Sequence, residues 1–129
     1  MQSFMEKATD FGVDMVNLQK YLSRECHEYT ISDQIKRSGT AIGASYGESR
    51  FAESDADFVH KLRIALKEAN ETKYWLDILK RTDYIQQDQY DKFKGDLSEL
   101  IKILVSSINT TLKRMKRDKK NDDELNDIF

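Results

Sequence analysis

Two short arrangements in the sequence have the residue types that an active site would use. Asp57 and His60 are three residues apart, which places a carboxylate and an imidazole on one helix face, as carboxylate-bridged metal sites in helical bundles require. Those sites need a second such pair, but the only other histidine is His27, near the end of the first expected helix. The sequence therefore disfavours a dimetal site, and we expect no metal and no other cofactor.

Cys26 and His27 are adjacent and together offer a thiol nucleophile and a base. Neighbouring residues on a helix diverge by about 100°, so the two side chains cannot face each other, and an ordinary helix-end pair is the better interpretation. The sequence has no glycine-rich phosphate loop, no Ser-His-Asp set and no CxxC motif. We therefore expect no enzyme activity and no small-molecule substrate.

Two carboxylates, Glu68 and Glu71, lie in a partly apolar stripe of the third expected helix. The other residues of that stripe are Ile64, Trp75 and Ile78. A carboxylate beside apolar side chains loses hydration and needs a partner, which Lys36 or Arg37 of the preceding helix can supply. We expect a structural ion pair that fixes the helix register, and acid-base chemistry is the less favoured alternative.

A basic run near the C-terminus could contact the phosphates of a nucleic acid, each contact adding salt-dependent affinity. It consists of Lys113, Arg114, Lys116, Arg117, Lys119 and Lys120. The alternative is a solvated helix end, because basic residues suit the C-terminal end of the helix dipole and no aromatic residues for base stacking are interleaved with them. Four acidic residues follow the run, namely Asp122, Asp123, Glu124 and Asp127.

The composition of the chain favours a single soluble helical domain. Its 129 residues can bury one modest core. Proline is absent and glycine occurs five times, so little in the sequence would break a helix. Charged residues make up 34% of the chain, the formal net charge is −2, and no stretch is apolar enough to cross a bilayer. The single cysteine and the lack of an export signal predict a cytoplasmic protein with no membrane contact.

The spacing of apolar residues predicts four helices, over residues 3–24, 32–49, 54–82 and 88–116. We expect Ser32 to cap the second helix, with Ile31 as a hydrophobic staple, and Ser54 with Asp57 resembles a capping box before the third. Short connections between amphipathic helices favour an all-α, up-down-up-down four-helix bundle over residues 1–116. Residues 117–129 are charged and weakly apolar, so we expect a flexible tail there.

The third helix has two apolar stripes. The first consists of Phe58, Leu62, Ala65, Ala69, Thr72, Leu76 and Leu79 at a spacing that alternates between four and three residues. The second stripe, which contains Ile64, Trp75 and Ile78, lies about 100° around the helix axis from the first. Because a bundle of this size has a limited interior and interfaces favour Trp, we expect these three residues to contact another subunit.

Much of the second and third helices resembles one bacterial protein family. The likeness is carried by residues 34–48 (QIKRSGTAIGASYGE), Arg50 and residues 52–54, 57–58, 60–62, 64–72 and 74–76. The family comprises four-helix-bundle proteins encoded in intervening sequences of 23S ribosomal RNA. The resemblance implies a left-handed up-down bundle that forms a ring-like homopentamer, with no established enzymatic activity and no catalytic residues to carry over.

Related accessory proteins of diversity-generating retroelements are pentamers that bind nucleic acid and a reverse transcriptase. The leading hypothesis is therefore a non-enzymatic homo-oligomer, with a pentamer favoured, that contacts RNA or a nucleic-acid-handling partner such as a reverse transcriptase. The residues expected at that contact are Lys36, Arg37, Arg50 and the run from Lys113 to Lys120. The alternative is a protein-protein interaction scaffold that does not bind nucleic acid.

Overall fold

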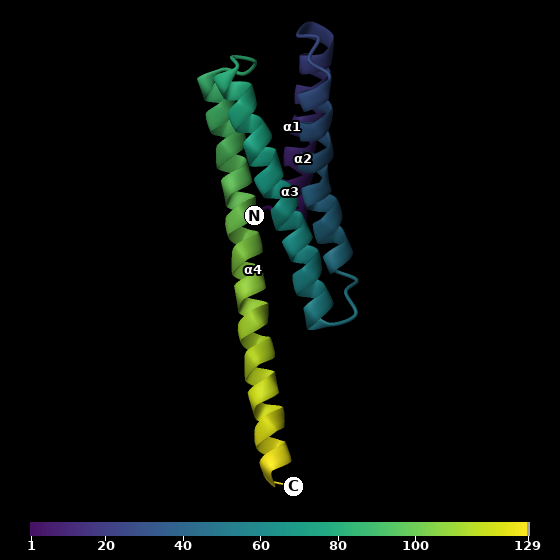
Figure 1. Cartoon of the computed structure of the whole chain (residues 1–129), viewed down its shortest axis with the longest axis vertical. Helices are drawn as coiled ribbons and strands as arrows, with labels where there is room; N and C mark the ends of the chain where they lie inside the picture. Colours follow the sequence, from purple (N-terminus) through teal and green to yellow (C-terminus); the bar gives the residue numbers. More distant parts are fainter. Residues whose placement is uncertain (129) are drawn as a thin grey trace.

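The computed structural model describes residues 1–128, which form four helices and no strands. The helices are α1 (Phe4–Glu25), α2 (Thr30–Ser49), α3 (Asp55–Arg81) and α4 (Gln87–Ile128). Each helix packs against its neighbours in sequence, and α4 also contacts α1 (Figure 1). The prediction of an all-α four-helix bundle is confirmed. No helix in the described chain is long and apolar enough to cross a membrane.

Helix α1 begins at a capped N-terminus and ends in a left-handed turn. The Ser3 hydroxyl accepts a hydrogen bond from the Glu6 backbone N–H at 3.1 Å. At the other end, His27 has a φ of 54°, and the Glu28 N–H donates to the Leu22 carbonyl at 2.9 Å. The chain reverses there, so that α2 runs back along α1.

Helix α2 begins two residues before the predicted start. The expected cap, Ser32, is fully buried inside the first turn, and its hydroxyl donates to the Tyr29 carbonyl at 3.1 Å. The Glu28 carboxylate instead accepts from the Ser32 N–H at 2.7 Å. The prediction that Ser32 caps α2 is therefore wrong, because the turn at His27 brings the carboxylate of Glu28 to the free amides first.

Helix α3 begins at the predicted Ser54 cap, and the Asp57 carboxylate of the predicted capping box bonds one residue before that cap. The Ser54 hydroxyl accepts from the Asp57 N–H at 3.0 Å, and the Asp57 carboxylate accepts from the Glu53 N–H at 3.2 Å. Its first apolar stripe is buried as predicted from Leu62 onward, but Phe58 is only half-buried and Val59 lies in the core in its place. In the first turns of α3 the core position is therefore residue 59, one residue later than the predicted residue 58.

Helix α4 is much longer than predicted. Its buried residues are Leu97, Leu100, Leu104, Ile108 and Thr111, all in the part that packs on the bundle. The helix continues to Ile128 instead of ending near residue 116, so residues 117–128, where the sequence predicts a flexible tail, are helical. Residues 116–128 are exposed and contain neither Pro nor Gly, so the backbone hydrogen bonds continue without packing (Figure 1). Phe129, the last residue of the predicted tail, lies outside the described residues.

Candidate nucleic-acid interface

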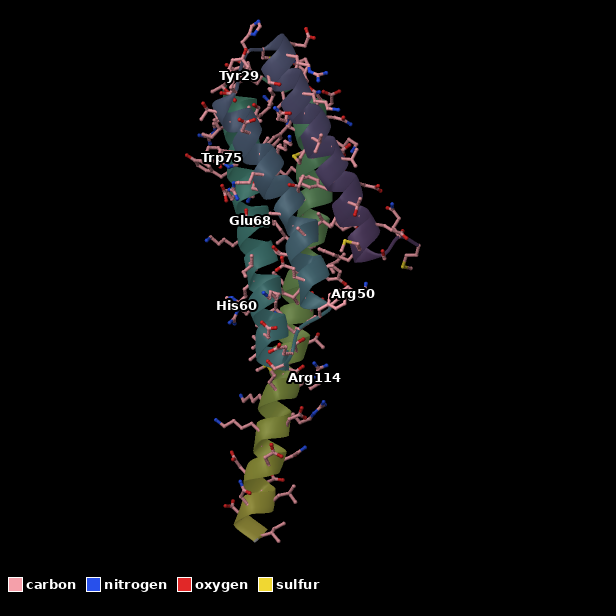
Figure 2. All side chains as sticks on the ribbon, turned by 90° about the vertical axis from the view of Figure 1, so that its right-hand side faces the viewer. Tyr29, Arg50, His60, Glu68, Trp75 and Arg114 are labelled. Carbon is pink, nitrogen blue, oxygen red and sulfur yellow. The ribbon has the colours of Figure 1, made fainter. Side chains whose placement is uncertain are left out.

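A polar cleft of about 600 Å³ lies where the connection between α2 and α3 meets α4. It is lined by Ser49, Arg50, Ala52, Glu53, Ser54, Asp55, Phe58, Ser106, Ser107, Thr110, Thr111 and Arg114. Figure 2 shows Arg50 and Arg114 at the same end of the bundle. We call this feature the Arg50–Arg114 cleft. The structure thus brings together two of the basic residues that the sequence analysis selected from distant parts of the chain.

A hydrogen-bonded turn holds Arg50 at the end of α2. Consecutive backbone N–H groups of Arg50, Phe51 and Ala52 donate to carbonyls three residues earlier, at 3.3, 3.0 and 3.1 Å. The preceding residue, Ser49, is buried, and its hydroxyl donates to the Tyr46 carbonyl at 2.6 Å. Arg50 is exposed and forms no ion pair within residues 1–128. Its guanidinium is therefore available to an anion from outside.

Arg114 enters the cleft from α4 and is paired. Its Nη2 donates to Asp55 Oδ1 at 2.7 Å, and this hydrogen bond raises the pKa of Arg114 above its usual value. Both side chains remain partly exposed, at 47% for Arg114 and 40% for Asp55. One carboxylate oxygen does not use all five guanidinium donors, so Arg114 can bind a second anion.

The remaining basic run extends from the cleft along the exposed surface of α4. Lys113, Lys116, Arg117, Lys119 and Lys120 line a shallow depression of about 610 Å³, together with Asp123. We call these five residues the α4 basic track. Asp118 and the acidic residues after Lys120 lie on the same helix and reduce the local positive potential. Cleft and track together form the largest cluster of the predicted basic contact residues.

The other two predicted contact residues lie elsewhere. Lys36 is exposed on α2, about 20 Å along the helix from Arg50 at 1.5 Å per residue. Arg37 pairs with both Glu68, at 3.2 Å, and Glu71 of α3. The hydrogen bond between Arg37 and Glu71 raises the pKa of Arg37 and lowers that of Glu71. The predicted structural ion pair is therefore present, and it occupies the guanidinium of Arg37.

The second stripe of α3 is only partly covered by its own chain. Ile64, Trp75 and Ile78 are half-buried, and Trp75 packs against the edge of the core while its Nε1 donates to Glu71 Oε1 at 3.3 Å. The Tyr74 ring meets the Trp75 ring edge-on, with centroids 5.2 Å apart, and is itself 58% exposed. This flank retains apolar surface that α2 and α4 do not cover.

A second apolar surface lies between α1 and α2. It is a groove of about 640 Å³ lined mainly by small and apolar residues, among them Met5, Gly12, Val13, Val16, Gly43 and Ala44. Val13 is 53% exposed there. The small residues let α1 and α2 approach closely, because a Cβ at Gly12 or Gly43 would lie within 4 Å of the other helix.

The residues considered for catalysis lie at helix ends or on the exposed surface, and no two of them form a catalytic pair. Asp57 caps α3, and His60 is exposed one turn later (Figure 2). His27 Nδ1 lies 3.1 Å from the Tyr29 hydroxyl at the reversal between α1 and α2, and Cys26 caps the end of α1. Within residues 1–128, His, Cys, Asp and Glu side chains form no group of three that could hold a metal ion.

Comparison with known proteins places this bundle in a family. The sequence model described as 23S rRNA-intervening sequence protein matches residues 2–106, most of the chain. The chain belongs to the 23S rRNA-intervening sequence protein family. The family resemblance noted from the sequence is therefore confirmed.

A solved structure supports the same assignment. It is a protein with unknown function from the S23 ribosomal protein family of Bacteroides thetaiotaomicron, and it is 50% identical in sequence. The match covers 82% of this chain and 98% of that chain, with a TM-score of 0.81. Comparison with curated proteins finds no match.

The family match divides the candidate interface. Arg50 and its turn lie inside the matched residues 2–106, whereas Arg114 and the α4 basic track lie beyond them.

One exposed aromatic residue is not evident from the sequence, because it is far from the basic run in sequence. Phe51 follows Arg50 directly and is 88% exposed. Its position next to Arg50 was the only sequence signal that could have identified it.

Proposed function

We propose that this chain is a non-enzymatic, cytoplasmic protein that assembles with copies of itself, with a pentamer favoured, and contacts RNA. The contact lies at the Arg50–Arg114 cleft and continues along the α4 basic track. The observation that carries this proposal is the presence of two arginines from distant parts of the chain in one polar cleft. A fork of guanidinium donors matches the oxygens of a phosphate, and hydroxyls of Ser106 and Thr110 add further donors.

The overall charge of −2 does not oppose local binding of RNA. Phosphate contacts depend on the potential near the site, which falls off within about 10 Å at ordinary salt. Glu99 and Asp14 pair with Lys7 and Lys92 between α1 and α4, whereas Asp118 and Asp123 lie beside the track and reduce its potential. Glu53 and Asp55 reduce the potential inside the cleft, so we expect moderate affinity rather than tight binding.

Self-association is supported by the apolar surfaces that the monomer leaves uncovered. The flank of α3 at Ile64, Trp75 and Ile78 is half-buried, and the groove between α1 and α2 exposes Val13. Contiguous apolar patches on a soluble domain commonly mark interfaces. A second copy is the favoured occupant of the groove. Lys20 is the one charged residue among those that line the groove, so its contact with a second copy would rest on apolar packing.

The test uses two charge-matched double variants and a structured RNA hairpin. Arg50→Gln with Arg114→Gln removes two charges from the cleft, and Lys67→Gln with Lys73→Gln removes two from the exposed face of α3. We expect the cleft variant to bind more weakly, with the slope of log affinity against log salt reduced by about two, at roughly 0.9 per phosphate contact. The α3 variant should bind like the original chain. Equal losses in both variants would refute a localised contact.

The alternative function is a protein-protein interaction scaffold with no nucleic-acid binding. It is favoured by the apolar groove between α1 and α2, which is a feature of protein contacts rather than of phosphate contacts. An assembled chain that fails to bind the RNA hairpin even at low salt would support this alternative against the RNA contact.

A further inference from the structure

We propose that Phe51 is a stacking platform for an unpaired RNA base, next to the phosphate that Arg50 binds, so that the cleft recognises single-stranded RNA. This inference rests on the proposed RNA contact and names the kind of RNA. It begins with the exposure of Phe51, which at 88% is almost complete. Among the phenylalanines in residues 1–128, Phe4 and Phe11 are buried, and Phe58 and Phe93 are half-buried.

An exposed phenylalanine is unfavourable for a monomer, because burying such a side chain is worth about 1.5–3 kcal/mol. The other exposed aromatic side chains of the described chain are tyrosines, whose hydroxyls can bond to water. Phe51 has no polar group. An external flat apolar partner would remove its ring from water, and a nucleobase is such a partner.

The turn fixes where this ring lies. The N–H groups on both sides of Phe51 and its own N–H are all hydrogen-bonded to α2 carbonyls, so the backbone at the ring is ordered before any ligand arrives. The two neighbours of Phe51, Arg50 and Ala52, both line the cleft. Phe51 does not itself line the cleft but lies between two residues that do, and because its backbone is hydrogen-bonded already, binding would order little besides the ring.

A nucleotide has a phosphate at one end and a base at the other, and Arg50 and Phe51 suit these two groups. Their Cα atoms are about 3.8 Å apart, as for any adjacent residues, and the longer arginine side chain can reach a phosphate while the phenylalanine ring meets the base. Aromatic stacking combined with a basic groove is the usual mode of binding to single strands. A base inside an A-form duplex is already stacked and cannot offer its face. Unpaired nucleotides are therefore the ligand that fits both residues.

The experiment measures binding of the full chain to a short oligouridylate and to a fully paired RNA duplex. We expect Phe51→Ala to weaken oligouridylate binding about 5- to 150-fold, which corresponds to about 1–3 kcal/mol of stacking per base. Duplex binding should not change, because it uses phosphate contacts alone. Phe51→Trp should restore oligouridylate binding, and its added indole fluorescence should be quenched by the oligonucleotide. Thermal unfolding of Phe51→Ala should match that of the original chain, since the side chain is exposed.

The salt dependence separates this inference from the proposed function. Phe51→Ala removes no charge, so its slope of log affinity against log salt should equal that of the original chain, whereas Arg50→Gln should lower the slope by about one. If Phe51→Ala binds oligouridylate as well as the original chain does, the stacking platform is refuted and the phosphate contact stands. A smaller particle mass for Phe51→Ala would instead place the ring between copies of the chain and would also refute stacking. Failure of the original chain to bind any RNA would refute both.

Discussion

The guanidinium of Arg114 lies 2.7 Å from the carboxylate of Asp55, which ties the middle of α4 to the first residue of α3. This ion pair forms one wall of the Arg50–Arg114 cleft. Beyond it, from residue 116 onward, every described side chain of α4 is exposed. The pair therefore marks the point at which α4 leaves the bundle and the α4 basic track becomes accessible from all sides.

Asp55→Asn should strengthen RNA binding, because it removes a negative charge from the cleft and frees Arg114. The unfolding free energy should fall slightly, from the loss of a surface ion pair and of an acid in the first turn of α3. Fluorescence anisotropy and urea unfolding measure the two effects. Glu99→Gln, which breaks the surface pair with Lys7, is the control and should leave RNA affinity unchanged. Weaker RNA binding by Asp55→Asn would contradict the role given to the cleft.

Thr72→Val should destabilise the bundle by about 1–3 kcal/mol. The Thr72 and Ser38 hydroxyl oxygens lie 2.8 Å apart and both residues are fully buried between α2 and α3. The valine keeps the shape but leaves the Ser38 hydroxyl without this partner. Adding Ser38→Ala should cost less than the sum of the two single changes, as measured by urea unfolding. Strict additivity would show that the two hydroxyls do not interact.

Gly39→Ala should destabilise the bundle by about 1–3 kcal/mol, because α1 and α2 are in close contact there. A Cβ at this position would overlap the side chain of Met15, which is completely buried. Gly95→Ala is the matched control, since a Cβ there meets nothing within 4 Å on the exposed side of α4. It should stabilise the protein by about 0.4–1 kcal/mol. Similar melting temperatures for both variants would disprove the close packing at Gly39.

Trp75→Ala should shift the assembled protein toward smaller species in light scattering, because we place the α3 flank against a neighbouring copy. Phe51→Ala is the control that removes a large exposed ring from a different surface, and its particle mass should not change. Trp75 also packs on the edge of its own core, so some loss of melting temperature is expected as well. An unchanged particle mass with a lowered melting temperature would assign Trp75 to the interior of the monomer alone.

Much of the fold follows from patterns that act over one or two helical turns. The stripe from Leu62 to Leu79 and the cap at Ser54 are local, and both are present in the structure. The start of α2 was misplaced because Glu28 competes with Ser32 for the free amides, and that outcome depends on the turn at His27. Low hydrophobicity does not mark the end of α4, because the residues after 116 are weakly apolar yet helix-forming as far as Ile128.

The candidate interface is harder to predict from the sequence than the fold is. Arg50 and Arg114 stand out in the sequence by charge, while Arg37 is also expected as a partner of Glu68 and Glu71, and the structure shows which of the three are paired. Arg37 meets two carboxylates of α3, whereas Arg50 meets none among the described residues. The cleft forms because the connection between α2 and α3, together with the first turn of α3, meets α4, a contact between segments distant in sequence. The relevance of Phe51 depends on the same tertiary contact.

The RNA contact is tested most directly by the affinity of the intact chain for an RNA hairpin with a single-stranded overhang, measured between about 50 and about 200 mM salt. We predict that log affinity falls linearly with log salt, because arginine and lysine side chains of the cleft and track displace counterions from phosphates. An affinity that does not change with salt, or no binding at the lowest salt, would contradict an RNA contact at this surface.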